Sequence, residues 1–331
     1  MIPAIIIGSV FAVGVIIFLI FFIRQNSGKK VKPSPEEKIQ NSEAAKLYKL
    51  AKKGDGEAYY KLHLLYKQNA LPANFGPEYT ERRTYLKKSA DLGYPQAQYE
   101  YGKSLIYSDD CSVAVAYLEK AATAGIIDAA SELAGIYNSV AYGVNFRGLK
   151  TPDKQTARKL QAKWLKVVAE SGDAEEQASL GYLYLYDLND KRSALEWFEK
   201  AAAQGNGSGL TGAARIYQER GGYEKALKYF TAAAERGDTC GMYWLGRFYF
   251  EEYAYDKEKA LYWLNKAAGS GKLADTPAMD YLAKLYEEGN VVGPDSEKAK
   301  YWRNKSKEAR EDFEERCAEI EETAKKDLSE D

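Results

Sequence analysis

Histidine is almost absent from this sequence, and cysteine is scarce. The 331 residues include one histidine, His63, and three cysteines, Cys111, Cys240 and Cys317. No H-x-x-x-H or C-x-x-C pair occurs, so the ligand spacing argues against a zinc site. A catalytic His63 would need a positioned partner, and packing within the fold is the favoured interpretation. We therefore expect no metal, no cofactor and no catalytic residue.

A disulfide framework is also not expected. Three cysteines are an odd number, which suits a reducing compartment. Cys111 and Cys240 fall in repeats four units apart, and stacked repeats separate such positions by more than a disulfide can span. Structural roles are favoured over a nucleophilic Cys111 at a helix start.

Charge of one sign does not dominate the chain, because its formal net charge is −1. Without a global basic field, nucleic acid is not an expected partner. The charge is nevertheless uneven: residues 24–32 carry only basic charges, and acids outnumber bases in residues 307–331. The acidic end is interpreted as a solvated helix end, with a partner-binding tail as the alternative.

An uncharged apolar run extends from Ile2 to Ile23. At about 1.5 Å per residue, such a helix spans the roughly 30 Å hydrocarbon core of a bilayer. A cleaved signal peptide would have a basic residue before the run, a shorter apolar stretch and a small-residue cleavage site. None of these is present, so we predict an uncleaved transmembrane helix over residues 1–23.

Basic residues follow this run and none precedes it. The positive-inside rule therefore predicts an external N-terminus, with residues 24–331 in the cytoplasm. A periplasmic location is the alternative, because a free α-amino group also opposes translocation. Residues 24–40 are rich in lysine, serine and proline and are predicted to be an exposed linker.

Glycines that end helical runs recur at intervals of 32 to 47 residues. A mostly small residue follows each of the first six glycines by nine positions and the seventh by twelve. We call this the small-residue position. Three residues beyond it, six of the seven units have tyrosine. The glycines are Gly54, Gly93, Gly125, Gly172, Gly205, Gly237 and Gly271, and the small-residue positions are His63, Gly102, Ala134, Gly181, Ala214, Gly246 and Ala283.

The second half of each unit repeats as well. A tyrosine or tryptophan lies eight residues before the glycine in six units, and alanine lies three before it. Five units begin this half with aspartate, at Asp110, Asp153, Asp190, Asp256 and Asp295, where a carboxylate can cap free backbone N–H groups. Each unit is therefore predicted to be two antiparallel helices, A and B, which approach closely through small residues.

This pattern resembles the Sel1-like branch of the tetratricopeptide-repeat superfamily. The resemblance rests on stretches such as AQYEYGKSLIY (97–107), SALEWFEKAAAQG (193–205) and EKALYWLNKAAGSG (258–271). It implies an all-α protein, a right-handed superhelical solenoid of helical hairpins, which the transmembrane helix predicted from the apolar run would precede. Residues 41–310 are assigned to about seven helix pairs plus a capping helix at 43–53, and residues 311–331 to an acidic helical tail.

The same resemblance implies that the A helices line a concave groove. In tetratricopeptide repeats the positions three before, one after and four after the small-residue position face this groove. Aromatic and basic residues at such positions are typical anchors of protein interfaces. The predicted groove residues are Tyr60, Leu64, Tyr99, Lys103, Ile106, Tyr182, Leu185, Arg215, Tyr243, Arg247, Phe250 and Lys284. The alternative is that some of these aromatics pack between neighbouring A helices.

Two A–B loops, residues 67–79 and 138–153, are longer than the others and form a second candidate surface. Long loops in compact arrays are often functional. Phe75, Tyr142, Phe146 and Arg147 would be exposed anchors there. Tolerated insertions are the alternative.

The resemblance implies a non-catalytic protein-binding module, which we expect to be tethered to a bacterial inner membrane. Its partner would be an extended peptide or a protein surface. Two roles fit: an adaptor or scaffold, and an immunity-type inhibitor of a toxin effector. The alternatives are a glycan-binding scaffold of an envelope or exopolysaccharide system, and the regulatory subunit of an enzyme. An open groove lacks the enclosed pocket that chemistry prefers.

Overall fold

The computed structural model describes residues 35–68, 82–251, 255–269, 273–290 and 293–327, and these are mainly helical. No strand occurs in these ranges, which confirms the predicted all-α repeat architecture. The chain divides into two compact units, with the boundary between Tyr101 and Gly102. The handedness of the superhelix remains a prediction.

The first unit contains α2 (Pro35–Ala51), α3 (Gly56–Lys67), α4 (Arg82–Asp91) and the start of α5 (Pro95–Leu105). α2 begins inside the segment that the sequence assigned to the linker. Ala51, Ala58, Leu62 and Tyr85 form a buried cluster in this unit. His63 is also buried.

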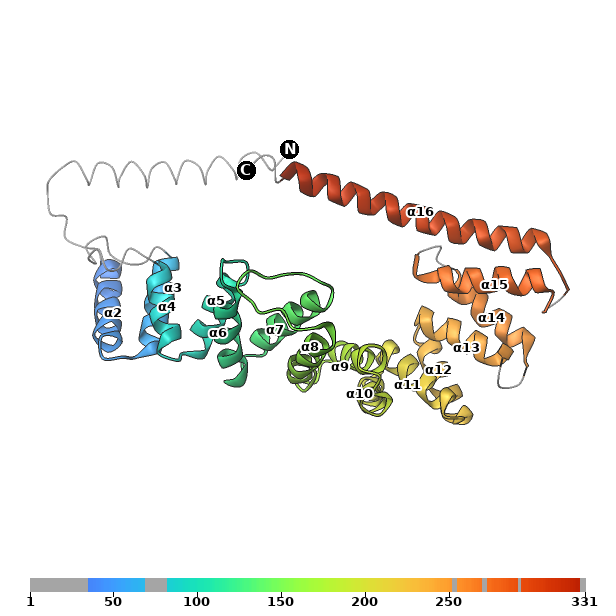
Figure 1. Cartoon of the computed structure of the whole chain (residues 1–331), viewed down its shortest axis with the longest axis horizontal. Coiled ribbons are helices and arrows are strands. Elements are labelled where there is room, and N and C mark those ends of the chain that lie inside the picture. Colours follow the sequence, from blue (N-terminus) through green and yellow to red (C-terminus); the bar gives the residue numbers. More distant parts are fainter. Residues whose placement is uncertain (1–34, 69–81, 252–254, 270–272, 291–292, 328–331) are drawn as a thin grey trace. The chain divides into compact units, whose positions relative to one another are not determined.

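The second unit contains the remaining helix pairs (Figure 1). Its helices are α6 (Cys111–Thr123), α7 (Ile127–Ala141), α8 (Lys154–Ala169), α9 (Ala174–Tyr182), the π-helix η2 (Leu183–Asp187), α10 (Lys191–Ala203), α11 (Gly207–Glu219), α12 (Tyr223–Glu235), α13 (Thr239–Glu251), α14 (Lys257–Ala267), the 3₁₀ turn η3 (Leu273–Asp275), α15 (Thr276–Glu288) and α16 (Ser296–Asp327). The A helices are the odd-numbered ones from α3 to α15, and each precedes its B helix.

The turn glycines and helix caps form as the sequence predicts. Six of the seven turn glycines have positive φ, and the seventh, Gly271, lies outside the described residues. Such a backbone conformation favours glycine because it lacks a Cβ atom. All five predicted aspartates accept a hydrogen bond from a backbone N–H of the first helical turn.

At two of the small-residue positions, helices A and B approach closely. A Cβ atom added at Gly181 would lie 2.6 Å from the Phe198 ring, and one added at Gly246 would lie 2.6 Å from Leu264. Ala214 and Ala283 at the same position are fully or almost fully buried. The predicted reason for the repeat is confirmed, since larger side chains would overlap the B helix.

The last B helix, α16, has 32 residues and continues well beyond its contact with α15. Ala299 and Ala309 are buried, whereas Phe313 and Ile320 are exposed. α16 therefore covers the last A helix with its first half and extends into the acidic end.

Among the helices in the described part of the chain, none combines the length and apolar character needed to span a bilayer. The predicted transmembrane segment, residues 2–23, lies outside the described residues. The anchor therefore stays a prediction.

Candidate protein-binding surface

Aromatic and arginine side chains from four consecutive A-type elements contact one another in the second unit. We call this set the aromatic–arginine ladder. Contacts between its members join each repeat to the next, so the ladder is continuous over several helices. Its residues are Tyr182 of α9, Tyr186 of η2, Arg215 of α11, Trp244 and Arg247 of α13, and Tyr281 of α15.

Arg215 lies at the centre of the ladder. Its guanidinium carbon is 4.4 Å from the ring centroid of Trp244 and 5.7 Å from that of Tyr186. Its Nη1 group also donates a hydrogen bond to the Tyr186 hydroxyl. Among the described residues, these partners are rings and a hydroxyl rather than a carboxylate. Arg215 therefore keeps a net positive charge while cation–π contacts hold its plane in place.

Arg247 joins the ladder to the following repeat. Its guanidinium carbon lies 4.9 Å from the Trp244 centroid and 5.2 Å from the Tyr281 centroid. In contrast to Arg215, its Nη2 group bonds both carboxylate oxygens of Glu251, at 3.0 and 2.8 Å. The Tyr281 hydroxyl donates to the same carboxylate at 2.6 Å. Arg247 thus connects α13 to α15, and the Glu251 carboxylate balances its positive charge.

The π-helix η2 sets the position of Tyr186. Its hydrogen bond from Leu188 N to Leu183 O, 3.1 Å long, spans five residues instead of four. The Tyr186 ring stacks on Tyr182, with centroids 5.9 Å apart and planes inclined by 3°. Isolated π-helical turns are frequent at functional sites. Here the turn directs one exposed tyrosine towards Arg215.

Three residues at the ladder have shifted pKa values. Burial raises the pKa of the Tyr182 phenol above its ordinary value. Burial, together with the Glu251 carboxylate, likewise raises the pKa of Tyr281. For Arg247, burial opposes the charged form, but Glu251 and Tyr243 outweigh it and raise the pKa. Tyr182 and Tyr281 therefore stay neutral, and Arg247 stays charged.

The structure brings together four of the predicted groove residues. Tyr182, Arg215 and Arg247 belong to the ladder itself. Tyr243 contacts it, since its ring centroid is 5.3 Å from that of Trp244 and its hydroxyl accepts from Arg247 at 3.4 Å. All four side chains are partly exposed.

Two other predicted anchors are interior residues, which corrects the expectation that they face an open groove. Tyr60 is buried, donates to Glu100 and lies 5.1 Å from the ring of Tyr94. Phe250 is buried between Tyr255 and Tyr281. Ile106, a further predicted groove residue, is buried as well. Their large apolar surfaces pack between neighbouring elements, as the alternative interpretation allowed.

The remaining predicted groove residues lie outside the ladder. Lys103 is exposed and pairs with Glu132 at 2.6 Å. Lys284 is exposed and lies 3.8 Å from Glu288 on its own helix. Tyr99, Leu64 and Leu185 are half-buried.

The segment predicted as a long loop, residues 138–153, begins in the last turn of α7, and its non-helical part, residues 142–153, packs against the preceding repeat. Arg147 forms an ion pair with Asp109, and its carbonyl accepts a 2.8 Å hydrogen bond from Cys111 N. The rings of Phe146 and Tyr107 lie 6.2 Å apart. Phe146 and Arg147 therefore hold the loop in place, and Phe75 of the other long loop lies outside the described residues.

Tyr142 is 74% exposed and lies over a buried arginine. The guanidinium carbon of Arg158 is 4.6 Å from the Tyr142 centroid. Arg158 also pairs with Asp187 of η2 at 2.8 Å and donates to Asn138 at 2.7 Å. One side chain of α8 therefore links the loop to the element that carries Tyr186.

Sequence reasoning missed Tyr186, Trp244 and Tyr281. Trp244 and Tyr281 both lie two residues before the small-residue position, and Tyr186 lies five after it. Tyr182, Arg215 and Arg247 lie one residue after the small-residue position. The three offsets, two before, one after and five after, have the i, i+3, i+7 spacing of one helix face. The ladder thus shares the position one after the small residue with the set taken from tetratricopeptide repeats, and its other two positions each differ from that set by one residue; this spacing was visible in the sequence.

The family model described as Sel1 repeat matches five segments of this chain, residues 95–126, 177–206, 216–238, 241–272 and 276–309. The first segment contains the complete pair of α5 and α6, and the other four contain parts of their pairs; together the segments include every residue of the ladder except Arg215. These five matched segments, which together cover just under half of the chain, are therefore similar to Sel1 repeats. No curated protein sequence matches the chain.

Several solved structures are similar to the chain at low identity. A Sel1 repeat protein from Oxalobacter formigenes is 21% identical, with a TM-score of 0.46 and coverage of 75% of this chain and 96% of that one. The protective antigen c5321 of uropathogenic Escherichia coli is 22% identical, with a TM-score of 0.44 and coverage of 80% and 63%. The immunity protein Pa5087 from Pseudomonas aeruginosa is 21% identical, with a TM-score of 0.39 and coverage of 65% and 81%. Similarities at this level say nothing about what this chain binds.

Proposed function

We propose that this Sel1-repeat protein is a non-catalytic protein-binding module and that the aromatic–arginine ladder is its principal contact surface. One observation carries the proposal: Arg215 is stacked between two rings, partly exposed and without a carboxylate partner among the described residues. Tryptophan, tyrosine and arginine are the residues that most often dominate binding energy. A side chain held in this way loses little freedom when a partner binds.

The partner surface is expected to present a carboxylate to Arg215. The guanidinium fork matches a carboxylate in a bidentate arrangement, and stacking leaves its edge for this purpose. Arg247 is already neutralised by Glu251, so one charged contact is expected at the centre of the interface. The flanking rings would supply apolar contact area around it.

The proposal is tested by comparative capture with the full chain. Wild-type protein and the Arg215→Glu variant would be used as bait in extracts of native membranes, with quantitative mass spectrometry of the bound proteins. Lys159→Glu provides a matched control, because it makes the same charge change on an exposed position of α8. A protein retained by wild type and by Lys159→Glu, and lost from Arg215→Glu, supports the ladder. Equal retention by all three baits would remove it as the contact surface.

The adaptor and inhibitor roles make different predictions for the captured partner. A toxin-neutralising protein would bind one partner in fixed stoichiometry and very tightly, whereas a scaffold would bind several partners weakly. Titration calorimetry with the purified partner distinguishes them. Glycan binding would instead depend on exposed ring faces, so loss of glycan affinity in Tyr182→Ala and Tyr243→Ala, without a protein partner, would favour that alternative.

Membrane tethering is part of the proposal and is supported by the apolar run at residues 2–23. A tether would raise the effective concentration of the ladder near a membrane-bound partner. Fusion of a cytoplasm-active reporter after Asp331 tests the orientation. A signal from this reporter is expected, and a signal only from a periplasm-active reporter would reverse the topology.

A further inference from the structure

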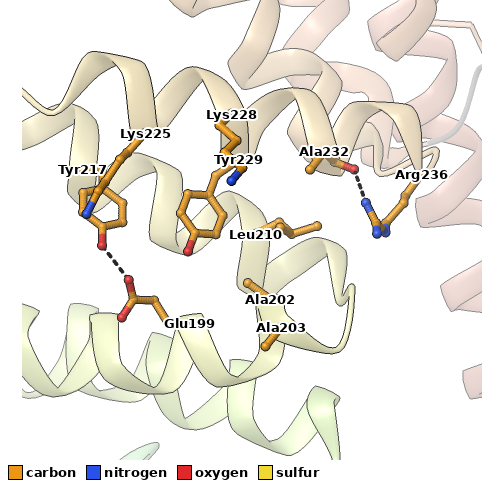
Figure 2. Close-up of a pocket in the computed structure, with 10 residues that line it drawn as sticks. All are labelled: Glu199, Ala202, Ala203, Leu210, Tyr217, Lys225, Lys228, Tyr229, Ala232 and Arg236. Atoms are coloured by element: carbon orange, nitrogen blue, oxygen red, sulfur yellow. Dashed lines mark hydrogen bonds between the residues drawn. The ribbon is translucent and has the colours of Figure 1, made fainter.

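A cavity of about 430 Å³ lies between two consecutive B helices, α10 and α12, with α11 as its third wall (Figure 2). None of its residues belongs to the ladder. Its volume is within the roughly 300–1,000 Å³ of typical ligand sites. The lining residues are Glu199, Ala202, Ala203, Leu210, Tyr217, Lys225, Lys228, Tyr229, Ala232 and Arg236.

Two stacked tyrosines form one side of this cavity. The rings of Tyr217 and Tyr229 have centroids 5.7 Å apart and planes inclined by 12°. The Tyr217 hydroxyl donates to Glu199 at 2.5 Å, as the dashed line in Figure 2 shows. This carboxylate raises the pKa of Tyr217, and burial raises that of Tyr229. Both rings therefore offer neutral apolar faces, and Glu199 is already engaged.

Cations surround the apolar part of the cavity. The Lys225 ammonium lies 4.7 Å from the Tyr217 centroid, and Arg236 Nη1 donates to the Ala232 carbonyl at 3.2 Å. Together with Lys228, these are three exposed cations, and none forms an ion pair with a described carboxylate. Several lysines on other B helices pair with an acid three or four residues away.

We propose that this cavity is a second binding site, which accepts an acidic peptide segment carrying one aromatic or branched aliphatic side chain. The apolar side chain would enter between Leu210, the three alanines and the tyrosine rings. Carboxylates on either side of it would face Lys228 and Arg236. Charge complementarity selects the acidic partner, since the cavity has three cations and a single carboxylate that is already hydrogen-bonded.

The test uses a fluorescein-labelled peptide, Glu-Asp-Glu-Phe-Glu-Asp-Glu, and its counterpart with lysine at every acidic position. Fluorescence anisotropy with the full chain is expected to show binding of the acidic peptide only. Affinity should fall about tenfold or more in Lys228→Glu/Arg236→Glu, because both charged contacts are reversed. Lys159→Glu/Lys163→Glu on α8 is the control with the same charge change outside the cavity.

Ala232→Trp provides a second, charge-neutral variant, since the larger side chain would occupy the cavity. Loss of binding in this variant, with circular dichroism and melting unchanged, supports insertion of the phenylalanine. Equal losses in the cavity and control charge variants, or undiminished binding to Ala232→Trp, would overturn the site. Binding of inorganic phosphate with the same variant dependence, and no advantage for the peptide, would overturn the peptide assignment. These outcomes do not involve the ladder, so they leave the proposed function untouched.

Discussion

Gly181 of α9 lies directly against the Phe198 ring of α10, so close that a Cβ atom on the glycine would be 2.6 Å from two ring carbons. Gly212 of α11 approaches the same ring to the same distance. Phe198 is fully buried. One aromatic ring thus fixes the spacing within a repeat and between that repeat and the next.

Gly181→Ala is expected to destabilise the protein by about 1–3 kcal/mol, because the methyl group forces the ring or the helix to move. Gly135→Ala in α7 is the matched control: an added Cβ there has nothing within 4 Å. That control should stabilise by roughly 0.5–1 kcal/mol through helix propensity. Thermal or urea unfolding measures both changes, and a Gly181→Ala variant as stable as wild type would refute the close-packing explanation.

Asp190→Ala should lower the free energy of unfolding by about 1 kcal/mol at neutral pH, because α10 loses its N-cap. Asp190 accepts from the backbone N–H groups of Arg192 and Ser193 at 3.1 and 3.0 Å and from the Ser193 hydroxyl at 2.6 Å. The Ser193 hydrogen bonds lower the pKa of this carboxyl.

The sign of the pH effect follows from this lowered pKa. The contribution of Asp190 is present above the unfolded-state pKa of aspartate, about 4, and is lost as the pH falls through the lower folded-state value. The difference in stability between wild type and Asp190→Ala should therefore narrow on acidification. Urea unfolding of both proteins between pH 7 and pH 3 measures this difference. A difference in stability that increases as the pH falls would contradict the prediction.

Asp187→Ala should lower the free energy of unfolding by about 1–3 kcal/mol, because Arg158 is buried and would lose its counter-charge. Arg158→Met/Asp187→Ala should cost less than the sum of the two single variants, since no unpaired charge remains. Urea unfolding of the four proteins of this cycle gives the coupling. Simple additivity would show that the ion pair contributes nothing.

Arg215→Lys is expected to weaken the partner complex by about 1–3 kcal/mol, or roughly fivefold to 150-fold, although it keeps the charge. Lysine can neither stack on Trp244 and Tyr186 in the same way nor present a bidentate fork. Titration with the partner identified by capture measures the loss. Unchanged affinity in Arg215→Lys would mean that charge alone, and not the stacked guanidinium, recognises the partner.

The fold was largely predictable because its determinants are local. Turn glycines, N-cap aspartates and small residues have roles that depend on the few residues around them. The roles of residues such as Gly181 and Asp190 could therefore be predicted from the local sequence pattern. The start of α2 at Pro35 was missed, because a stretch rich in proline, serine and lysine also suits a linker.

The candidate site was only partly predictable, because side-chain direction depends on packing between repeats. Arg215 and Arg247 were identified from their offset. Tyr60 and Phe250 occupy related offsets but are buried. The position of Tyr186 depends on the π-helix η2, which the repeat pattern of the sequence does not predict. The cavity beside Tyr229 requires B helices from two repeats, so a single repeat gives no sign of it.

The π-helix η2 makes one part of the molecule sensitive to chain length. A π-helical turn accommodates an extra residue, because its hydrogen bonds run to i+5 instead of i+4. Deleting one residue from Leu183–Asp187 would restore an ordinary α-helical turn and rotate the residues before it by about 100° relative to those after it. Tyr186 and Asp187 could then no longer reach Arg215 and Arg158 together. A relative that lacks one residue in this segment would therefore lose the contact of Tyr186 with Arg215, even if every side chain of the aromatic–arginine ladder were the same.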